Sequence, residues 1–396
     1  MNIKMKIATI IKDIYNIGLS KHEAKIVQAV LESDNFGQFV INNKPVQVNK
    51  IAFLIPGIDR YSGGITSILR LGTYLQSMKY DISYVDVSDE KLKNLEINAK
   101  FNLLNYKGKI EKFKKTNYDS YDIVIAGNWY AVYFLNYYNA YKMYFIQDYE
   151  PYFFKLDERY LLAKKTLELG IHIVSLGKWN IQQIKRECHT VSKLNWIDFP
   201  YEPNEYCSNT IKDYYSYKNK KVISIAVYTK EEGKRIPNII QAVLKNAKES
   251  LAEYGIKLEV KFFGLKSSYK VSVGINLGKL TKAELVDLYN KSDFGMVASM
   301  TNISLVPYEM LAVGLPVIEM KDGSYSSFLP EESALLIDFN YSSLVKGIIN
   351  AVENPSIIEL RMIKAKKAIQ NLSWEKTAEQ FSKIISDIDV EVNDNK

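Results

Sequence analysis

The feature that most constrains the fold is the order of three short segments near the start of the chain. Ile51 to Pro56 is an apolar run, Gly63 and Gly64 form a turn, and Ile65 to Met78 repeats its apolar residues with the period of a helix. A second run with strand character, Asp81 to Val87, follows. This order predicts the strand, helix and strand of one βαβ unit, so we expect an α/β protein.

Length and composition bound the architecture. The chain has 396 residues, which is too long for one ordinary core, so we expect two domains. With 47% hydrophobic and 24% charged residues, its composition is typical of globular proteins. Cys188 and Cys207 are the only cysteines, which argues against a disulfide framework and a thiolate metal cluster. No apolar run approaches the roughly 20 residues that span a bilayer, and no signal peptide is evident. We expect a cytoplasmic protein, with a place at the inner face of the membrane left open.

The net charge of +7 raises the question of nucleic-acid binding. Lys and Arg are scattered among acidic residues rather than gathered in a stripe, so we expect no nucleic-acid partner. Modest basicity suits an anionic membrane surface or a phosphorylated substrate. A general bias toward Lys, Asn, Ile and Tyr explains the charge equally well, and peripheral contact with a membrane stays open.

The second half of the chain repeats the alternation of strands and helices. Leu258 to Phe263 predicts a strand, and Gly278 to Thr281 predicts a short strand that leads into a helix cap. Ala283 to Asn290 is amphipathic, and Ser292 to Ser299 predicts a buried strand. Ligands of open α/β sheets bind at the carboxyl ends of the strands, so we expect the loop after Ser299 to line a site.

The segment Thr301 to Val317 has the signals of a loop that becomes a helix. Asn302 or Ser304 can cap the helix start, and Gly314 supplies a left-handed exit. Such a helix start presents backbone N–H groups and positive dipole charge, which suit a diphosphate. Glu309, one to two turns further on, can reach a ribose or sugar hydroxyl. The pattern taken alone is more typical of an ordinary capped helix.

An ordered series of residues in this half resembles the donor half of the retaining GT-B glycosyltransferases of family four. The series is Gly264, Gly278, Asp293, Ser299, Glu309 and Gly314-Leu315-Pro316-Val317. The resemblance implies a GT-B fold, in which two Rossmann-like domains face each other across a cleft. Members of the family usually carry two glutamates separated by seven residues; here Thr301 stands at the first position and Glu309 at the second.

Candidate acceptor residues lie in a stretch rich in tyrosine. Two apolar runs predict buried strands that end at Asn128 and Trp129 and at Gln147, Asp148 and Tyr149. Aromatic faces stack on sugars while amides and carboxylates bind hydroxyls, so we expect these five residues to bind the acceptor. For most of the surrounding tyrosines, core packing is the better explanation.

The run from Gln147 to Phe154, with Gly170 to Trp179, resembles one branch of family four more specifically. That branch contains the rhamnosyltransferases that build bacterial surface polysaccharides from dTDP-rhamnose, and it tolerates a residue other than glutamate near Thr301. The resemblance covers roughly residues 50 to 385. Retaining members need no general base on the protein, so Asp148 is expected to position the acceptor.

The loop after the strand Val222 to Val227 supplies cations. The resemblance implies that Lys234 and Arg235 bind the diphosphate and stabilise the charge that grows on it, so together with Glu309 they are the expected catalytic residues. Asp387-Ile388-Asp389 is the only Asp-x-Asp and lies in the C-terminal tail, so we expect no metal site. The expected donor-binding residues are Gly63, Gly64, Lys230, Gly264, Lys279, Leu280, Thr301, Asn302, Ser304, Leu305 and Val306.

Five segments are expected along the chain. They are an N-terminal helical extension (1–46), a Rossmann-like acceptor domain (47–205), a linker (206–218), a Rossmann-like donor-nucleotide domain (219–372), and a C-terminal helix that crosses back with its tail (373–396). The extension holds two helical candidates, Lys4 to Ile17 and Lys21 to Ser33, and Ser373 is expected to cap the last helix.

These features together predict a metal-independent glycosyltransferase. It would bind a nucleotide-diphosphate sugar, with dTDP-rhamnose as the leading donor, and a saccharide or lipid-linked acceptor, and it would need no cofactor. A homodimer stays open. One alternative, motivated by Thr301, is an inactive GT-B subunit that stabilises another transferase. A nucleotide-sugar epimerase is disfavoured because no well-placed acid and base pair is evident, and a dehydrogenase because the dinucleotide fingerprint is missing.

Overall fold

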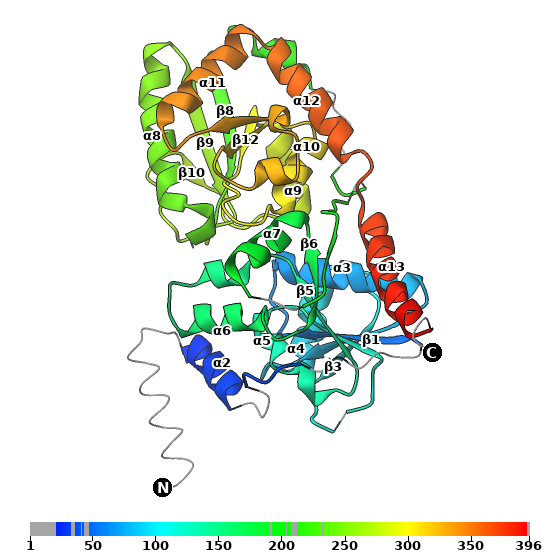
Figure 1. Cartoon of the computed structure of the whole chain (residues 1–396). Coiled ribbons are helices and arrows are strands. Elements are labelled where there is room, and N and C mark those ends of the chain that lie inside the picture. Colours follow the sequence, from blue (N-terminus) through cyan, green and yellow to red (C-terminus); the bar gives the residue numbers. More distant parts are fainter. Residues whose placement is uncertain are drawn as a thin grey trace. The chain divides into compact units, whose positions relative to one another are not determined.

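The structure is a computed structural model, and it describes residues 21–393 apart from 33–35, 41, 43–46, 117, 190–191, 203, 207–211 and 232 (Figure 1). The predicted helix Lys4 to Ile17 lies outside the described residues. The chain divides into two compact units. Unit 1 contains the residues up to Leu176, Asn180–Ile197 and the residues from Ala378, whereas unit 2 contains Gly177–Trp179 and Asp198–Thr377.

Unit 1 is built on a parallel sheet of seven strands in the order β3-β2-β1-β4-β5-β6-β7. The strands are β1 (Lys50–Ile55), β2 (Asp81–Asp86), β3 (Lys109–Lys112), β4 (Ile123–Ala126), β5 (Tyr141–Ile146), β6 (His172–Leu176) and β7 (Leu194–Ile197). The helices are α2 (Lys21–Leu31), α3 (Gly63–Ser77), α4 (Leu92–Asn102), α5 (Trp129–Val132), α6 (Glu158–Thr166) and α7 (Lys178–Glu187), with the 3-10 helices η1 (Leu135–Tyr137) and η2 (Glu150–Phe153). The predicted βαβ unit is confirmed as β1, α3 and β2.

Unit 2 is built on a second parallel sheet, with six strands in the order β10-β9-β8-β11-β12-β13. The strands are β8 (Val222–Tyr228), β9 (Lys257–Phe263), β10 (Ile275–Asn276), β11 (Phe294–Met296), β12 (Val317–Met320) and β13 (Ala334–Ile337). The helices are α8 (Pro237–Glu253), α9 (Lys282–Asn290), α10 (Leu305–Ala312), α11 (Tyr341–Glu353) and α12 (Ser356–Ile369), with the 3-10 helices η3 (Tyr214–Tyr217), η4 (Gly233–Arg235), η5 (Tyr325–Ser327) and η6 (Glu331–Ser333). Helix α8 packs against both β9 and α11 (Figure 1).

The last helix, α13 (Trp374–Asn393), contributes to both units. Trp374 is 1% exposed in unit 2, and Phe381 packs edge to face on Phe145 of β5 in unit 1. Ser373 Oγ accepts a hydrogen bond from the backbone N–H of Lys376 at 3.2 Å, so the predicted cap is confirmed. The carboxyl end of the chain therefore returns to the unit in which the described chain begins.

One local prediction in unit 2 is wrong. The segment Gly278 to Thr281 is not a strand; the strand at this edge is Ile275–Asn276. Gly278 has a φ of +75° and its N–H donates to Asn276 Oδ1 at 2.9 Å, so the extended backbone ends before this residue. Thr281 nevertheless caps α9, as predicted for this helix start, and it also forms a capping box with Glu284.

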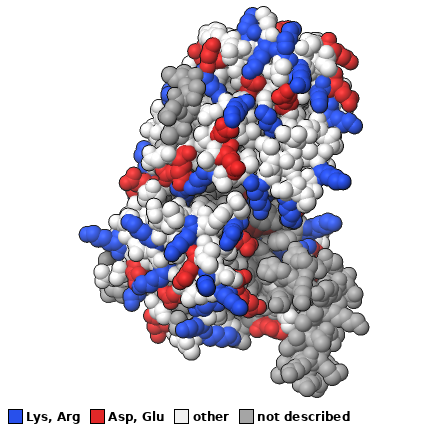
Figure 2. Space-filling view, turned by 180° about the vertical axis from the view of Figure 1, so that it is seen from behind, with Lys and Arg blue, Asp and Glu red and all other residues white. Residues whose placement is uncertain are grey.

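Charges are mixed on the face of the molecule that Figure 2 shows, as the sequence indicates. On the face in Figure 2, Lys and Arg alternate with Asp and Glu rather than gathering in a stripe. In the described part of the chain, no helix is long and apolar enough to cross a membrane.

Candidate functional site

The carboxyl end of β11 carries the loop that the sequence assigns to the donor. Strand β11 ends at Met296, earlier than predicted, and Thr301 and Asn302 in the loop are 4% and 1% exposed. Ser324 N–H donates to Ser299 O at 2.7 Å, and Ser324 Oγ donates to Thr301 O. The loop backbone is therefore held by the chain that follows β12.

Helix α10 begins at Leu305, directly after this loop. Ser304 occupies the cap position, but its side chain accepts no hydrogen bond from the helix, so the predicted capping role is wrong. Its Oγ is buried and has no partner among the described residues. Ser304, Leu305 and Val306 are partly exposed, which leaves the first turn of the helix accessible. Its backbone N–H groups are suited to an anion.

Glu309 lies one turn into α10 and is partly exposed. Burial raises the pKa of the Tyr289 phenol well above its usual value, and the negative charge of Glu309 raises it further. The carboxylate of Glu309 therefore lies close enough to α9 to interact with the Tyr289 side chain. Its place one turn into α10 agrees with the sequence, which predicts it one to two turns into this helix.

Arg235 is buried beneath the loop rather than displayed on the surface. It is 3% exposed, and its Nη1 donates to Ala298 O at 3.0 Å and to Ser299 Oγ at 3.3 Å. The preceding lysine, Lys234, is partly exposed, and Lys230 is exposed. The three cations of this segment thus differ: Arg235 supports the loop after β11, whereas Lys230 and Lys234 reach the surface.

Glu319 is a site residue that the sequence analysis missed. It is fully buried on β12, where its Oε2 accepts from Ser299 N at 2.9 Å and its Oε1 accepts from Ser299 Oγ at 2.6 Å. Burial raises its pKa to about 7, although the bonds from Ser299 and the charge of Arg235 act in the opposite direction. A glutamate inside the apolar strand Val317–Met320 was a usable signal, because buried acids need partners.

The other donor candidates have mixed environments. Gly264 has a φ of +92°, and a Cβ there would lie 2.7 Å from Thr229 O, so the fold itself requires glycine. Lys279 is exposed and Leu280 partly exposed. Hydrogen bonds from Lys266 lower the pKa of Glu231, and the positive charge of Lys279 lowers it slightly further, so this lysine lies near the loop that carries Lys230.

Asp293 lies at the opposite, amino end of β11. Its Oδ2 accepts from Ser224 N at 2.8 Å, and its Oδ1 pairs with Lys220 Nζ at 2.5 Å. The hydroxyl of Tyr217 donates to its backbone carbonyl at 2.6 Å. The carboxylate of Asp293 therefore joins the start of β11 to β8.

In unit 1, Gly63 and Gly64 open α3 at the carboxyl end of β1. Neither has a positive φ. A Cβ on Gly63 would meet no atom within 4 Å, and one on Gly64 would meet only the Gln147 side chain, at 3.6 Å. Gln147 Nε2 donates to Gly64 O at 3.1 Å, so the structure brings these candidates together. Nothing in the described chain requires glycine at either position.

The remaining acceptor candidates are engaged within unit 1. Asn128 Oδ1 caps α5 by accepting from Ala131 N at 3.0 Å, and Asp148 Oδ1 accepts from Tyr149 N at 2.9 Å. Trp129 and Tyr149 are 7% and 0% exposed, so protein covers most of their ring surfaces.

Glu150 fixes the start of α5. Its Oε2 accepts from Trp129 N at 2.6 Å and from Tyr144 Oη at 2.7 Å, and the residue is 7% exposed. Burial raises the pKa of Tyr144 well above its usual value, and the charge of Glu150 raises it further. The sequence analysis assigned no role to Glu150.

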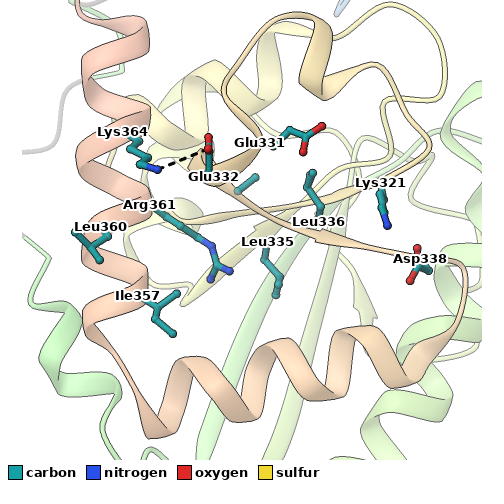
Figure 3. Close-up of a pocket in the computed structure, with 11 residues that line it drawn as sticks. Lys321, Glu331, Glu332, Leu335, Leu336, Asp338, Ile357, Leu360, Arg361 and Lys364 are labelled. Atoms are coloured by element: carbon teal, nitrogen blue, oxygen red, sulfur yellow. Dashed lines mark ion pairs between the residues drawn. The ribbon is translucent and has the colours of Figure 1, made fainter.

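Two further features of the described residues bear on other chemistry. No group of three or more His, Cys, Asp and Glu side chains in them is arranged to hold a metal ion. A cavity of about 790 Å³ lies in unit 2 beside β13 and α12, and none of the predicted site residues lines it (Figure 3).

Comparison with known proteins identifies the architecture. No protein-family model and no curated protein matches the sequence. Among solved structures, sucrose-phosphate synthase from Thermosynechococcus elongatus is 13% identical, with a TM-score of 0.62 over 86% of this chain and 99% of that one. HepE from Anabaena in complex with UDP-glucose is 13% identical, with a TM-score of 0.64 over 85% and 99%.

A third structure gives the same result. A mutant of S. aureus TarM, in complex with fondaparinux, alpha-GlcNAc-glycerol and UDP, is 11% identical, with a TM-score of 0.65 over 85% of this chain and 99% of that one. With the two parallel sheets, these likenesses confirm the predicted GT-B fold.

Proposed function

We propose that the protein is a glycosyltransferase that transfers a sugar from a nucleotide-diphosphate donor to a saccharide or lipid-linked acceptor. The observation that carries the proposal is the glycine pair at the start of α3. Gly63 and Gly64 leave the helix start bare although neither backbone conformation nor packing requires glycine. A bare helix start lets a phosphate or a sugar approach the backbone N–H groups.

The donor diphosphate is assigned to the start of α10 in unit 2. Its accessible N–H groups and the exposed lysines of the loop after β8 would offset the phosphate charge without a metal. In this proposal Lys234 and Lys230 contact the diphosphate, and Glu309 binds a hydroxyl of the ribose or the sugar. Arg235 acts through the loop that it holds, since its guanidinium bonds to Ala298 and Ser299.

The donor is proposed to be dTDP-rhamnose, and the product a bacterial surface polysaccharide made at the inner face of the membrane. This part rests on the resemblance of the segment from Gln147 to Trp179 to the rhamnosyltransferases. Two of the similar structures, HepE and TarM, were solved with UDP or UDP-glucose, so uridine nucleotides are the competing donors. A retaining outcome follows from the same resemblance.

A binding panel followed by a turnover assay tests the proposal. The full chain is titrated with UDP, dTDP and GDP and with UDP-glucose and dTDP-rhamnose, and the melting temperature is recorded. A ligand that binds only the folded state raises stability by an amount set by its affinity. Release of nucleoside diphosphate is then compared for wild type and Glu309→Gln. A wild type that binds none of these nucleotides would refute the assignment.

The alternative of an inactive GT-B subunit is kept because of Thr301. In the resemblance a glutamate holds the transferred sugar at this position, whereas Thr301 is buried and its carbonyl accepts from Ser324. A wild type that fails to turn over every donor, yet raises the activity of a purified transferase with which it forms a defined complex, would favour this alternative.

A further inference from the structure

The cavity of unit 2 lies along the outer edge of the sheet. It is open to solvent, has a volume of about 790 Å³ and is bounded by β13, by η6 and by α12 (Figure 3). Ala334, Leu335 and Leu336 all line it. Because successive residues of a strand point to opposite faces, a cavity that touches all three must run along the strand edge. Strand β13 is the last in the sheet order, so this edge has no neighbouring strand among the described residues.

Arg361 is directed from α12 toward β13 in this cavity (Figure 3). Its side chain is half-buried, and burial lowers its pKa below the usual value. Among the residues that the structure describes, it makes no hydrogen bond and no ion pair. Glu332, an acid of the same cavity, pairs instead with Lys364 at 3.8 Å.

Other buried cations of unit 2 have partners. Lys212 Nζ donates to the carbonyls of Tyr289 and Ser292 at 2.8 and 2.7 Å, and Arg235 bonds to Ala298 and Ser299. A guanidinium that is partly removed from water without an acceptor is costly. Arg361 has no such acceptor among the described residues, so its half-buried guanidinium is available to an anion from outside the chain.

The lining sets the chemistry of that acceptor. Three cations, Lys321, Arg361 and Lys364, face three acids, Glu331, Glu332 and Asp338. This balance favours a ligand with one anionic group over a diphosphate, whose second charge would meet the acids. Leu335 is 8% exposed and Leu360 is 59% exposed, so the cavity also offers apolar walls.

We propose that this cavity is a second binding site, for a small amphipathic anion. One carboxylate or phosphate group binds the fork of Arg361, and an apolar body covers Leu335 and Leu360. The cavity lies within unit 2 and shares no residue with the donor assignment, so the two sites are expected to fill independently.

Isothermal titration of the full chain tests the proposal. The probes are octanoate and octyl phosphate, with octanol as the uncharged control and acetate and inorganic phosphate as controls without an apolar body. We expect one of the octyl anions to bind with a stoichiometry of one, at least tenfold more tightly than octanol and the short anions. Which of the two binds more tightly identifies the head group as carboxylate or phosphate.

Two variants locate the binding. Arg361→Gln is expected to weaken binding of the octyl anion by roughly tenfold or more, as is usual when a charged hydrogen bond is lost. Lys367→Gln, on the exposed face of the same helix and outside the cavity, should stay within twofold of wild type. Arg361→Lys keeps the charge but not the fork, and tests the site should Arg361→Gln fold poorly. Equal binding of octanol, unchanged binding by Arg361→Gln and Arg361→Lys, or no binding of either octyl anion would each overturn the proposal.

Discussion

Replacing Gly64 by alanine tests the proposed role of the α3 start without disturbing the fold. The added Cβ would meet only the Gln147 side chain, with Nε2 at 3.6 Å, which is an ordinary van der Waals contact. The residue has no positive φ, so alanine adopts the same backbone without strain. Any effect of Gly64→Ala on turnover must therefore come from what approaches the helix start.

The expected effect on stability is small and favourable. A Gly to Ala change at a compatible position stabilises a protein by about 0.4 to 1 kcal/mol, because the unfolded chain loses freedom. In a domain of this size that corresponds to a rise of roughly 1 to 4 °C in melting temperature. Turnover should fall at least tenfold, since a methyl group would hold a phosphate or sugar oxygen away from the N–H groups that bind at about 2.9 Å.

Gly72, two turns further along α3, is the matched control. A Cβ there would lie 2.3 Å from the Tyr84 hydroxyl, which donates to the carbonyls of Leu69 and Lys107 at 3.1 and 2.9 Å. Gly72→Ala should destabilise unit 1 by about 2 to 4 kcal/mol, through overpacking and displacement of a buried hydroxyl.

The two variants separate a ligand role from a structural one. Thermal unfolding and nucleotide release are measured for both. Gly64→Ala should keep or raise the melting temperature and lose turnover, whereas Gly72→Ala should lower the melting temperature. If Gly64→Ala kept its turnover and donor affinity within twofold of wild type, the reasoning would be refuted. The absence of a side chain at this position would then serve neither the fold nor a ligand.

Three further predictions concern unit 2. Lys234→Ala should lower the rate of nucleotide release at least tenfold. It should leave the melting temperature within about 1 °C of wild type, because a partly exposed side chain contributes little to folding. An equal loss of rate in Lys248→Ala, which changes a distant lysine, would contradict a specific role for Lys234. Glu309→Gln should weaken donor binding by roughly tenfold, measured by titration, while the melting temperature stays unchanged. The pKa of Glu319 is raised to about 7 in the folded protein, so between about pH 4.5 and 7 the folded state binds a proton that the unfolded state has lost. The free energy of unfolding of wild type should therefore fall as the pH rises through this range, by about 3 kcal/mol at most. Melting curves at several pH values should show a weaker slope for Glu319→Gln, and an identical slope would exclude Glu319 as its source.

The two sheets were predictable because each strand is an apolar run followed by a turn signal. The residues at which the strands end could not be predicted, because they depend on hydrogen bonds to residues distant in the sequence. Strand β11 stops at Met296 since the residues after it are held by Arg235 and Glu319, and these partners are more than 60 residues before it and about 20 after it in the chain. The strand predicted at Gly278 fails for a local reason, a left-handed glycine, that the sequence shows only as one more glycine.

Glycines illustrate why the site could be predicted only in part. The sequence marks Gly63, Gly64 and Gly264 alike as places where backbone and ligand can meet. In the structure Gly264 is required by its φ and by the carbonyl of Thr229, so its presence carries no information about a ligand. The pair at α3 has no such internal cause.

The polar candidates can likewise be divided into those that the fold requires and those that it does not. The side-chain oxygen of Asn128 caps α5, the carboxylate of Asp293 joins two strands, and the guanidinium of Arg235 holds a loop. Each of these groups is already engaged in a bond that the fold needs, so a ligand would have to displace that bond or share the group. Lys230, by contrast, is exposed on the loop after β8. The case for a ligand therefore depends most on residues that the fold does not explain, which is why Gly64→Ala tests it more sharply than any change to a buried polar residue.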